Sequence, residues 1–538
     1  MSTLSHSSNE DLVCLPYGVG HGDEGVCLLV KMGPYRILLD CGLRDIKPLI
    51  GVDRQPICDL VICSHAHADH ARGLLDLHRA FPQLPIYTSE VTSHLLPLNW
   101  LDDKAGVPHL SQALPWRRSI EFADGLSAEL FPAGHLPGAA AVLLTYTGFY
   151  KSYSIFYTGD FFLSNSRLVE GLHLDAIRNL NPDVLMIEGS YGTARHPHRR
   201  KQENTLMARI DRAIGQQQSV ILPVTQLGIA QELLILLRSH HLFTGRDIDI
   251  WVDSAIAAAY DAYLPLLDSF PPSVQNFARH QSLFWDEKVR PHVRQLTPET
   301  LPKIHQRQCI IITEKYTDLD TYTQGHPFPV LVLLPSSPHG ITIFPPTTPE
   351  MAVETYLLSE HSDGAGTAQL IHNIRPKHVV FVHGSAPYLA DLTGLEELQN
   401  RYHLHSPSAG TLVSLPIGET FIQPAPPTDP NYEGELIELE REINITLPNA
   451  IASDPRWHNF ADTGSIEARW QGEEIVLRGI SPREILARQQ ELNLDPDTPC
   501  CGNCRFQRGS RCYNSRSPLH NFKVTPDGFC PAFEQGKG

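Results

Sequence analysis

Seven residues near the start of the chain hold an unusual density of side chains that could bind metal ions. The stretch Ser64-His65-Ala66-His67-Ala68-Asp69-His70 carries the pattern H-x-H-x-D-H. Imidazole nitrogens and carboxylate oxygens are common ligands of first-row metals in proteins. Because the chain has 27 His in 538 residues, a surface loop that is rich in histidine by chance is the alternative interpretation.

The residues around this stretch predict how it is presented. Residues 60–63 form a short apolar run typical of a buried strand, and residues 71–80 have helical spacing. His65 and His67 alternate, so both can point the same way, while the pair 69–70 turns toward a second position at the helix start. One loop can therefore serve two metals about 3.5–4 Å apart, an arrangement that suits hydrolysis because one ion activates water and both neutralise oxygens that gain charge.

Four later runs with strand-like sequence end in residues of the same kind. Their last residues are His135, Asp160, Glu188 and His383. His135 is the natural third nitrogen for the first metal, and Asp160 can bridge both ions because each carboxylate oxygen can take one. Active sites of open sheets lie at strand ends, so we expect these residues to converge on one binuclear site.

The composition is that of an ordinary globular protein, with 42% hydrophobic and 19% charged residues. The net charge of −17 argues weakly against a nucleic-acid partner, because repulsion from phosphate is global while binding depends on local patches. The N-terminal residues lack a basic run followed by an apolar core, and no run of 18 apolar residues occurs. We therefore expect a cytoplasmic protein without membrane contact.

The ordered set of motifs resembles the β-CASP nucleases, a branch of the metallo-β-lactamase fold that includes the endonuclease of mRNA 3′-end cleavage and ribonuclease J. The resemblance covers roughly residues 12–420. Besides the H-x-H-x-D-H loop, the matching motifs are Leu39-Asp40-Cys41-Gly42, Ala133-Gly134-His135 with Gly138-Ala139-Ala140, Tyr157-Thr158-Gly159-Asp160, Glu188-Gly-Ser-Tyr-Gly192 (motif A), Ser359-Glu-His361-Ser-Asp363 (motif B) and Phe381-Val-His383-Gly384 (motif C).

The resemblance implies a role for each matching residue. The first zinc ion would be held by His65, His67 and His135, the second by Asp69, His70 and His383, and Asp160 would bridge the two. Glu188 and His361 would form the catalytic pair, and Asp69 counts among the catalytic residues as well as the ligands. In this reading His361 protonates the departing sugar oxygen and Glu188 orients its ring. The alternative is structural, with Glu188 capping a turn and His361 opening a helix.

The resemblance also implies an α/β fold: a four-layer αββα metallo-β-lactamase domain, an inserted α/β domain (the β-CASP insert), and here a small Cys-rich C-terminal module. Long apolar runs alternate with helical stretches between motifs A and B, which favours a parallel sheet in the insert. We place the metallo-β-lactamase domain at 12–202 and 351–423, the insert at 203–350, a linker with a small α+β unit at 424–499, and the module at 500–538.

Several positions depart from the pattern of the branch. Ile229 stands where Arg usually follows the first insert glycine, Pro137 and Glu360 replace apolar residues, and the glycine loop expected before motif B is missing at 315–325. The basic stretch at 195–201 could replace part of this phosphate cradle, with contacts from Arg199, Arg200 and Lys201. The alternative is a solvated loop.

Four cysteines crowd into the last residues with spacing that suits a metal: Cys501, Cys504, Cys512 and Cys530, with Cys500 as a spare. Four thiolates can hold a structural Zn²⁺ or an iron–sulfur cluster, and both readings stay open. Upstream, residues 466–470 and 474–477 predict a hairpin, and residues 481–484 predict a helix start.

Together these features favour a zinc-dependent metallohydrolase that cleaves phosphodiester bonds, a ribonuclease in RNA processing, with two Zn²⁺ in the active site. The expected partner is RNA, and a homodimer or larger assembly is left open. One alternative is hydrolysis of a small ester, thioester or cyclic phosphodiester by the same ions. Another is an assembly subunit without catalysis, against which the complete ligand set argues.

Overall fold

The computed structural model describes residues 12–286, 288–336 and 351–415 and several short stretches beyond them. Those stretches are residues 437–439, 442–444, 466–471, 474–479, 504–508, 511–517, 520 and 532–534. The chain divides into two units, Met1–Pro424 and Ala425–Gly538, which are considered separately.

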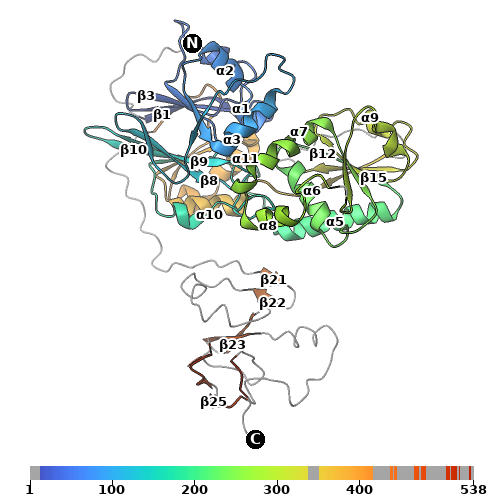
Figure 1. The fold of residues 1–538 in the computed structure, drawn as a ribbon. Helices are drawn as coiled ribbons and strands as arrows, with labels where there is room; N and C mark the ends of the chain where they lie inside the picture. Colours follow the sequence, from blue (N-terminus) through green and yellow to red (C-terminus); the bar gives the residue numbers. More distant parts are fainter. Residues whose placement is uncertain are drawn as a thin grey trace. The chain divides into compact units, whose positions relative to one another are not determined.

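Two seven-stranded sheets form the first domain of the larger unit (Figure 1). The first has the order β20-β1-β2-β3-β4-β5-β6, antiparallel from β20 to β3 and parallel from β3 to β6. Its strands are β1 (Leu12–Val19), β2 (Val26–Met32), β3 (Tyr35–Leu39), β4 (Leu60–Ile62), β5 (Ile86–Ser89), β6 (Gln112–Leu114) and β20 (Val413–Ser414).

The second sheet has the order β19-β18-β11-β10-β9-β8-β7, and its strands β10, β11, β18 and β19 are parallel to one another. The carboxyl ends of β10, β11 and β18 therefore share one edge. Its strands are β7 (Ile120–Ala123), β8 (Leu126–Pro132), β9 (Ala140–Thr147), β10 (Ser152–Tyr157), β11 (Val184–Glu188), β18 (His378–Val382) and β19 (His403–His405).

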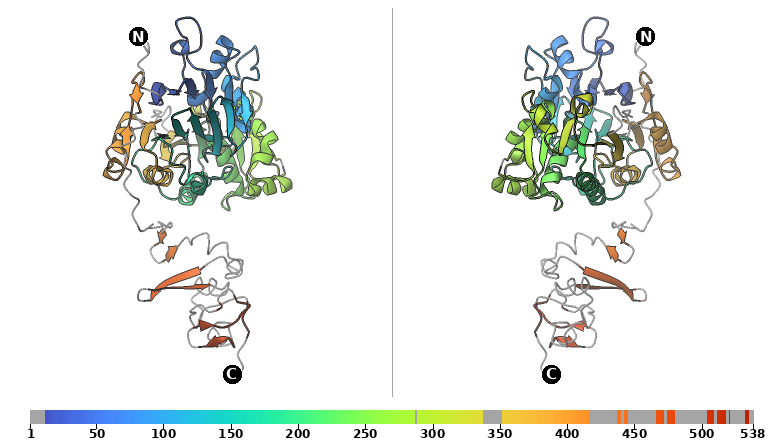
Figure 2. Two further views of the ribbon diagram at one scale, coloured as in Figure 1. Left: turned by 90° about the vertical axis from the view of Figure 1, so that its left-hand side faces the viewer. Right: turned by 90° about the vertical axis from the view of Figure 1, so that its right-hand side faces the viewer.

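The two sheets pack face to face through alternating apolar side chains. Leu28 and Ile37 of the first sheet share a core with Val142 and Ile155 of the second, and all four are fully buried. Helices cover the outer faces (Figure 2), which makes the four-layer αββα arrangement expected from the sequence. These helices are α1 (Ala68–Ala71), α2 (Leu74–Ala80), α3 (Glu90–Leu95), α4 (Leu174–Ile177), α10 (Gly364–Ile374), α11 (Ala386–Thr393) and α12 (Glu396–Gln399), with 3₁₀ turns at Lys47–Leu49 and Leu96–Trp100.

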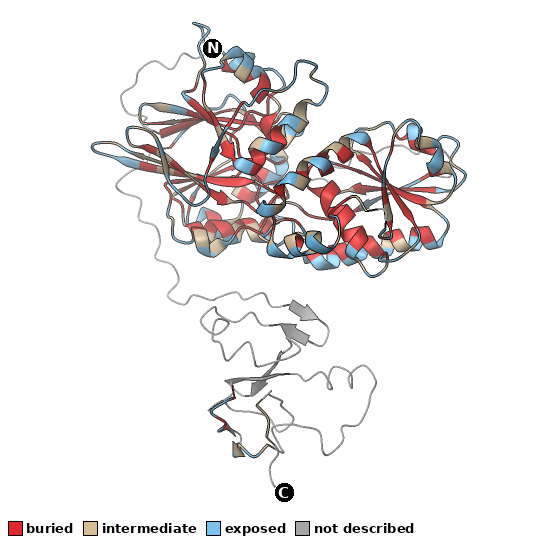
Figure 3. Cartoon of the chain, in the orientation of Figure 1, coloured by how far each residue is buried: buried red, intermediate tan, exposed pale blue. Residues whose placement is uncertain are grey.

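The insert is a parallel sheet of six strands in the order β14-β13-β15-β12-β16-β17. Its four central strands, β13, β15, β12 and β16, are buried (Figure 3), as their continuous apolar runs predict, whereas the edge strands β14 and β17 are partly exposed. The elements are α5 (Arg199–Gly215), β12 (Ser219–Val224), α6 (Ile229–Ser239), β13 (Asp249–Val252), α7 (Ser254–Tyr263), α8 (Pro272–His280), β14 (His292–Gln295), β15 (Cys309–Glu314), α9 (Asp320–Thr323), β16 (Val330–Pro335) and β17 (Met351–Tyr356), with 3₁₀ turns at Leu264–Ser269 and Leu301–His305.

One boundary of the insert differs from the expected one. We expected the insert to end at residue 350, but β17 pairs in parallel with β16 from Met351 to Tyr356 and so belongs to the insert sheet. The chain returns to the first domain only after this strand. The sequence of β17 does not predict this pairing, because the strand is held in the sheet by its apolar neighbour β16.

The smaller unit contains three short hairpins within its described stretches. They pair β21 (Ile437–Leu439) with β22 (Glu442–Asn444), β23 (Ile466–Gln471) with β24 (Glu474–Gly479), and β25 (Gln507–Arg508) with β26 (Arg511–Cys512). The second of these confirms the hairpin predicted from the sequence. The helix start predicted at 481–484 lies outside the described residues.

In the described part of the chain, no helix combines the length and apolar character needed to cross a membrane.

Candidate metal centre

The H-x-H-x-D-H loop leaves the end of β4 and turns into α1. His67 is the N-cap of α1, with extended backbone angles of φ −65° and ψ 147°, and helical geometry begins at Ala68. His67 therefore still has extended backbone geometry, while Asp69 and His70 lie on the first helical turn. The loop divides its side chains between two positions, as its spacing predicts.

Asp160, just after β10, lies at the meeting point of side chains from five strand ends. Its Oδ2 lies 3.5 Å from Nε2 of His65 and 3.7 Å from Nε2 of His135, and its Oδ1 lies 3.3 Å from Nε2 of His70. The Nδ1 atom of His383 lies 3.4 Å from the same Oδ1. The carboxylate is 1% exposed, so each of its oxygens faces a different group of buried imidazoles.

Two neighbouring clusters of ligand atoms result. In each cluster the candidate atoms lie within 4.8 Å of one another, which is the spacing that ligands of one ion require. The first cluster comprises His65, His67, His135 and Asp160, and the second comprises Asp69, His70 and His383. A third grouping joins Asp160 to Glu188, His361 and His383. The structure thus brings together all seven ligand residues predicted from the sequence.

In the first cluster, hydrogen bonds hold the ring nitrogens that point away from the centre. The Nε2–H of His67 donates to the carbonyl oxygen of Leu227 at 3.2 Å, and the Nδ1–H of His135 donates to the carbonyl of Glu360 at 2.9 Å. Nδ1 of His65 lies 3.0 Å from Oγ of Ser64. These partners assign the tautomers and direct the other nitrogen of each ring into the cluster.

In the second cluster, Asp40 is the common anchor. This carboxylate is fully buried and accepts hydrogen bonds from Nδ1 of His70 at 2.7 Å and from the hydroxyl of Tyr157 at 2.6 Å. It also accepts from the backbone N–H and the hydroxyl of Ser64. One acid therefore orients the loop and His70 together, while Nε2 of His383 lies 3.2 Å from Oδ2 of Asp69.

The arrangement of nitrogens fits a bound cation. With the tautomers assigned above, Nε2 of His135 and Nδ1 of His67 both present lone pairs, and they lie 3.1 Å apart. Within the described chain, Nε2 of His65 and Oδ1 of Asp160 are buried without a hydrogen-bond partner. Converging acceptors without donors are costly unless a metal ion lies among them, so the residues fit the zinc that their types imply.

The electrostatics of the two clusters differ. Burial lowers the pKa values of His65, His67 and His135, the last to about 3, so these rings are neutral and ready to ligate. Burial would also lower the pKa of His70, but Asp160 and Asp40 outweigh it and raise that pKa well above the ordinary value. A metal ion entering the second cluster must therefore compete with protons held there.

Glu188, at the end of β11, and His361 contact each other beside the clusters. Nδ1 of His361 lies 2.8 Å from Oε2 of Glu188, and Oε1 of Glu188 accepts from the backbone N–H of Phe161 at 2.6 Å. Burial would raise the pKa of Glu188, yet the charge of His361 brings it to about 2. Burial would lower the pKa of His361, but Glu188 and then Asp160 raise it. The two shifts together favour a carboxylate paired with an imidazolium.

Comparison with known proteins agrees with this geometry. Residues 22–223 match the sequence profile described as the metallo-beta-lactamase superfamily, and residues 350–400 match that of the Zn-dependent metallo-hydrolase RNA specificity domain. An uncharacterized protein of Synechocystis is 48% identical over 539 residues, covering 97% of this chain and 96% of the relative.

The chain belongs to the metallo-β-lactamase superfamily. Its parallel insert between motifs A and B places it in the β-CASP branch, among zinc-dependent metallohydrolases. A protein of Methanocaldococcus jannaschii, Probable RNase MJ4, is 30% identical over 42% of this chain and 56% of its own length. Integrator complex subunit 11 of Danio rerio is 23% identical over 90% of this chain and 84% of its own length.

The basic stretch of this metallo-β-lactamase protein differs in part from the expectation. Arg199 is not available to phosphate, because it is 4% exposed at the start of α5. Its guanidinium lies 3.6 Å from carboxylate oxygens of Glu203 and Glu232 and donates to the carbonyl of Ser359. Arg199 therefore joins α5 to α6 and to motif B, whereas Arg200 and Lys201 are exposed as expected.

Sequence reasoning did not find the supporting residues of the metallo-β-lactamase centre. Asp40 was noted only as part of a motif, and Ser190 was not singled out, although its hydroxyl contacts both Glu188 and Nδ1 of His383. A buried acid at the end of a strand was the available signal for Asp40. The backbone contact of Leu227 leaves no signal in the sequence.

Only two of the four predicted cysteine ligands in the C-terminal module are among the described residues. Cys512 is buried, Cys504 is half-buried, and both lie at the β25–β26 hairpin. Cys501 and Cys530 lie outside the described residues, so a metal at this module stays a prediction.

Proposed function

We propose that the chain is a two-zinc phosphodiesterase that cleaves RNA. The observation that carries the proposal is the convergence on Asp160 of two ligand clusters, with an imidazolium–carboxylate pair next to them. Two bound zinc ions would activate a water and neutralise the charge that develops on phosphoryl oxygens. Zinc at the first position would be held by His65, His67 and His135 and at the second by Asp69, His70 and His383, with Asp160 between them.

The chain's own residues supply the proton for the leaving group. When water attacks the phosphorus, the bond to the sugar oxygen breaks, and that oxygen needs a proton. Glu188 raises the pKa of His361, which favours its protonated form, and the His361 side chain is 14% exposed, so it is reachable from solvent. Glu188 acts through His361: it fixes the ring and keeps the acid form populated.

The insert completes the site from the other side. The carbonyl of Leu227 contacts His67, and Gly228 begins α6 at this point with a φ of 86°. An added Cβ at Gly228 would lie 2.5 Å from Oε1 of Glu360 and 3.9 Å from Nε2 of His67, so the backbone there approaches the site closely. The metal centre therefore lies where the two domains meet, which suits a polymer lying between them.

Two comparisons support RNA as the substrate class. The profile matched at residues 350–400 is that of an RNA specificity domain, and the relatives from Methanocaldococcus jannaschii bear the names Probable RNase MJ4 and RNase J-like protein. Arg200 and Lys201 would add exposed positive charge near motif A. The expected compartment is the cytoplasm.

Incubation of the zinc-loaded chain with labelled single-stranded RNA, DNA of the same sequence, and a generic ester tests the proposal. We expect shortening of the RNA, and we expect chelation with EDTA to stop it. Turnover of the ester alone would favour the small-molecule hydrolase instead. Failure to hydrolyse any of the three substrates would contradict catalysis by this centre.

A further inference from the structure

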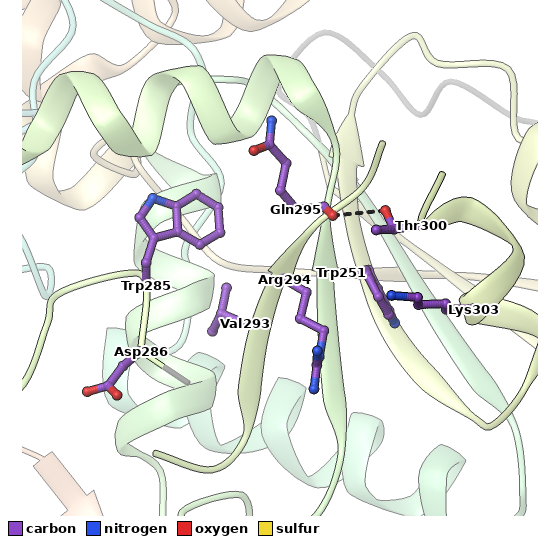
Figure 4. Close-up of a pocket in the computed structure, with 8 residues that line it drawn as sticks. All are labelled: Trp251, Trp285, Asp286, Val293, Arg294, Gln295, Thr300 and Lys303. Carbon is purple, nitrogen blue, oxygen red and sulfur yellow. Dashed lines mark hydrogen bonds between the residues drawn. The ribbon is translucent and has the colours of Figure 1, made fainter. Parts of the chain in front are cut away.

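A second feature of the insert lies away from the metal centre. A groove of about 340 Å³ crosses the edge strand β14 and is lined by Trp251, Trp285, Asp286, Val293, Arg294, Gln295, Thr300 and Lys303 (Figure 4). Its volume lies at the lower end of the range for sites that hold small molecules or single residues of a polymer. It combines indole rings with two basic side chains, a composition typical of surfaces that bind single-stranded nucleic acids.

Trp285 and Arg294 present flat surfaces in this groove. The indole N–H of Trp285 donates to Oδ1 of Asp261 at 2.7 Å, which fixes the ring and satisfies its only polar atom. The guanidinium of Arg294 lies 5.9 Å from the ring centroid of Trp251, and its Nε lies 3.2 Å from Oδ1 of Asp249. Both planar groups are therefore positioned before any ligand arrives, which reduces the entropy lost on binding.

The charge of the groove favours an anion. Lys303 is exposed, and Arg294 has a side chain that is 45% exposed despite its ion pair. The nearby acids are each engaged by a partner: Asp286 lies 4.0 Å from the buried Arg238, Asp249 pairs with both Arg294 and Arg307, and Asp261 accepts the indole N–H of Trp285. Two exposed cations beside aromatic surface match the alternation of phosphate and base along a nucleic-acid strand.

The position of the groove relates it to the metal centre. Strands β12, β13, β14 and β15 are all parallel, so their carboxyl ends share one edge of the sheet. Trp251 and Arg294 are register partners one residue before that edge, and β12 leads from the same edge to Leu227, the contact of His67. Three strand spacings of about 4.8 Å separate β14 from β12, roughly 14 Å.

We propose that this groove binds single-stranded RNA a few nucleotides away from the cleaved bond, with a base stacked on Trp285 and phosphates contacting Arg294 and Lys303. This inference rests on the proposed action on RNA. The groove would hold the strand along the carboxyl edge of the insert sheet and so favour long substrates over short ones. Stacking on an indole tolerates any base, so the groove adds affinity and not sequence preference.

Binding of a fluorescein-labelled oligoadenylate to the zinc-loaded full chain tests the proposal, with every variant made in a His361→Ala background so that the probe is not consumed. Trp285→Ala should weaken binding about tenfold, and Trp285→Phe, which keeps a stacking ring but loses the bond to Asp261, should restore most of it. Lys303→Ala should flatten the dependence of log affinity on log salt by about 0.7. Matched controls are Trp116→Ala and Lys104→Ala, both exposed in the other domain.

Unchanged affinity in Trp285→Ala would overturn the proposal, and so would a Phe variant as weak as the Ala variant. Hydrolysis is measured separately in chains that retain His361, where Trp285→Ala should raise KM for a long RNA while leaving kcat and the cleavage of a dinucleotide unchanged. If the Trp285 effect on binding appears but no RNA is cleaved, the ribonuclease proposal fails and the groove stands. If RNA is cleaved but Trp285→Ala does not change its binding, the groove proposal fails and the ribonuclease proposal stands.

Discussion

The imidazole of His361 and the carboxylate of Glu188 meet at 2.8 Å although 172 residues separate them along the chain. Glu188 belongs to the first part of the metallo-β-lactamase domain, and His361 follows the insert. The contact is therefore made only when the chain returns from the insert sheet. Formation of the Glu188–His361 contact depends on the insert being folded and correctly joined.

Substitution of the acid separates proton transfer from metal binding. In His361→Ala we expect RNA hydrolysis to fall by about 10²- to 10⁴-fold, because a positioned general acid contributes that much. Zinc content should stay at the wild-type value, since the two ligand clusters do not need this ring. Zinc per chain by elemental analysis and initial rates check both statements. Hydrolysis at the wild-type rate would show that His361 is not the acid.

The pH profile reports on Glu188. Because the pKa of His361 is raised above its ordinary 6.5, the acid form persists beyond that pH and is lost as pH rises through the raised value. The rate should therefore fall on the alkaline side. In Glu188→Gln the raising charge is gone, so this alkaline limb should move to lower pH. Rates measured from pH 5 to 10 check the shift, and an unmoved limb would contradict the positioning role.

Asp40 should control zinc affinity without touching zinc. Asn has nearly the same shape as Asp and also tolerates the positive backbone φ of 59° at position 40. Asp40→Asn therefore removes only the negative charge that holds His70 and Ser64. Zinc affinity should drop about 10- to 100-fold, as expected for a ligand's hydrogen-bond partner. Competition with a chromophoric chelator measures it. Asp59→Asn, at an exposed ion pair with Arg36, is the matched control and should bind zinc normally.

The two kinds of cation in the basic stretch should behave differently. Arg199→Ala removes the guanidinium beside the buried Glu232 and the donor to the carbonyl of Ser359, while Glu203 keeps its ion pair with Arg167, so the fold should be destabilised by about 3 kcal/mol. Neutralising Arg200 and Lys201 together should change stability little but weaken RNA binding and reduce its salt slope by about 1.4. Urea unfolding and binding titrations in salt separate the effects. A salt slope equal to wild type would remove the two exposed residues from the RNA surface.

Metal analysis of the C-terminal module decides between its two readings. A full-length chain with Cys504→Ser and Cys512→Ser should lose one metal equivalent, either zinc or an iron–sulfur cluster, and keep the zinc of the catalytic centre. A brown wild-type protein with iron would identify the cluster. Equal metal content in the wild-type and substituted chains would show that these thiols hold no metal.

The local features of the fold could be predicted from the sequence, and the long-range ones could not. Short apolar runs predict the helix at 229–239 and the strands around it. The metal-ligand loop can be recognised from seven consecutive residues. The burial of Arg199 could not be foreseen, because Glu232 is 33 positions away and a run of basic residues usually lies in solvent. The pairing of β17 with β16 likewise depends on the neighbouring strand and not on the residues of β17 itself.

The ligand sites show the same division. Strand ends that carry His or acid could be identified one by one, and the family pattern supplied their grouping. The supporting contacts of Leu227, Glu360 and Ser190 involve backbone atoms or a common hydroxyl, so nothing in their residue types marks them. What holds the ligands in place is therefore less visible in the sequence than the ligands themselves.

The bond from His67 to the carbonyl of Leu227 means that one ligand of the first ion is oriented by the insert and the other two are not. Any rotation of the insert away from the catalytic domain must break that bond and loosen this ligand. By thermodynamic linkage, an ion that binds more tightly when the bond is made must also favour the domain arrangement in which the bond forms. Metal loading and the relative orientation of the two domains are thus coupled in a single equilibrium.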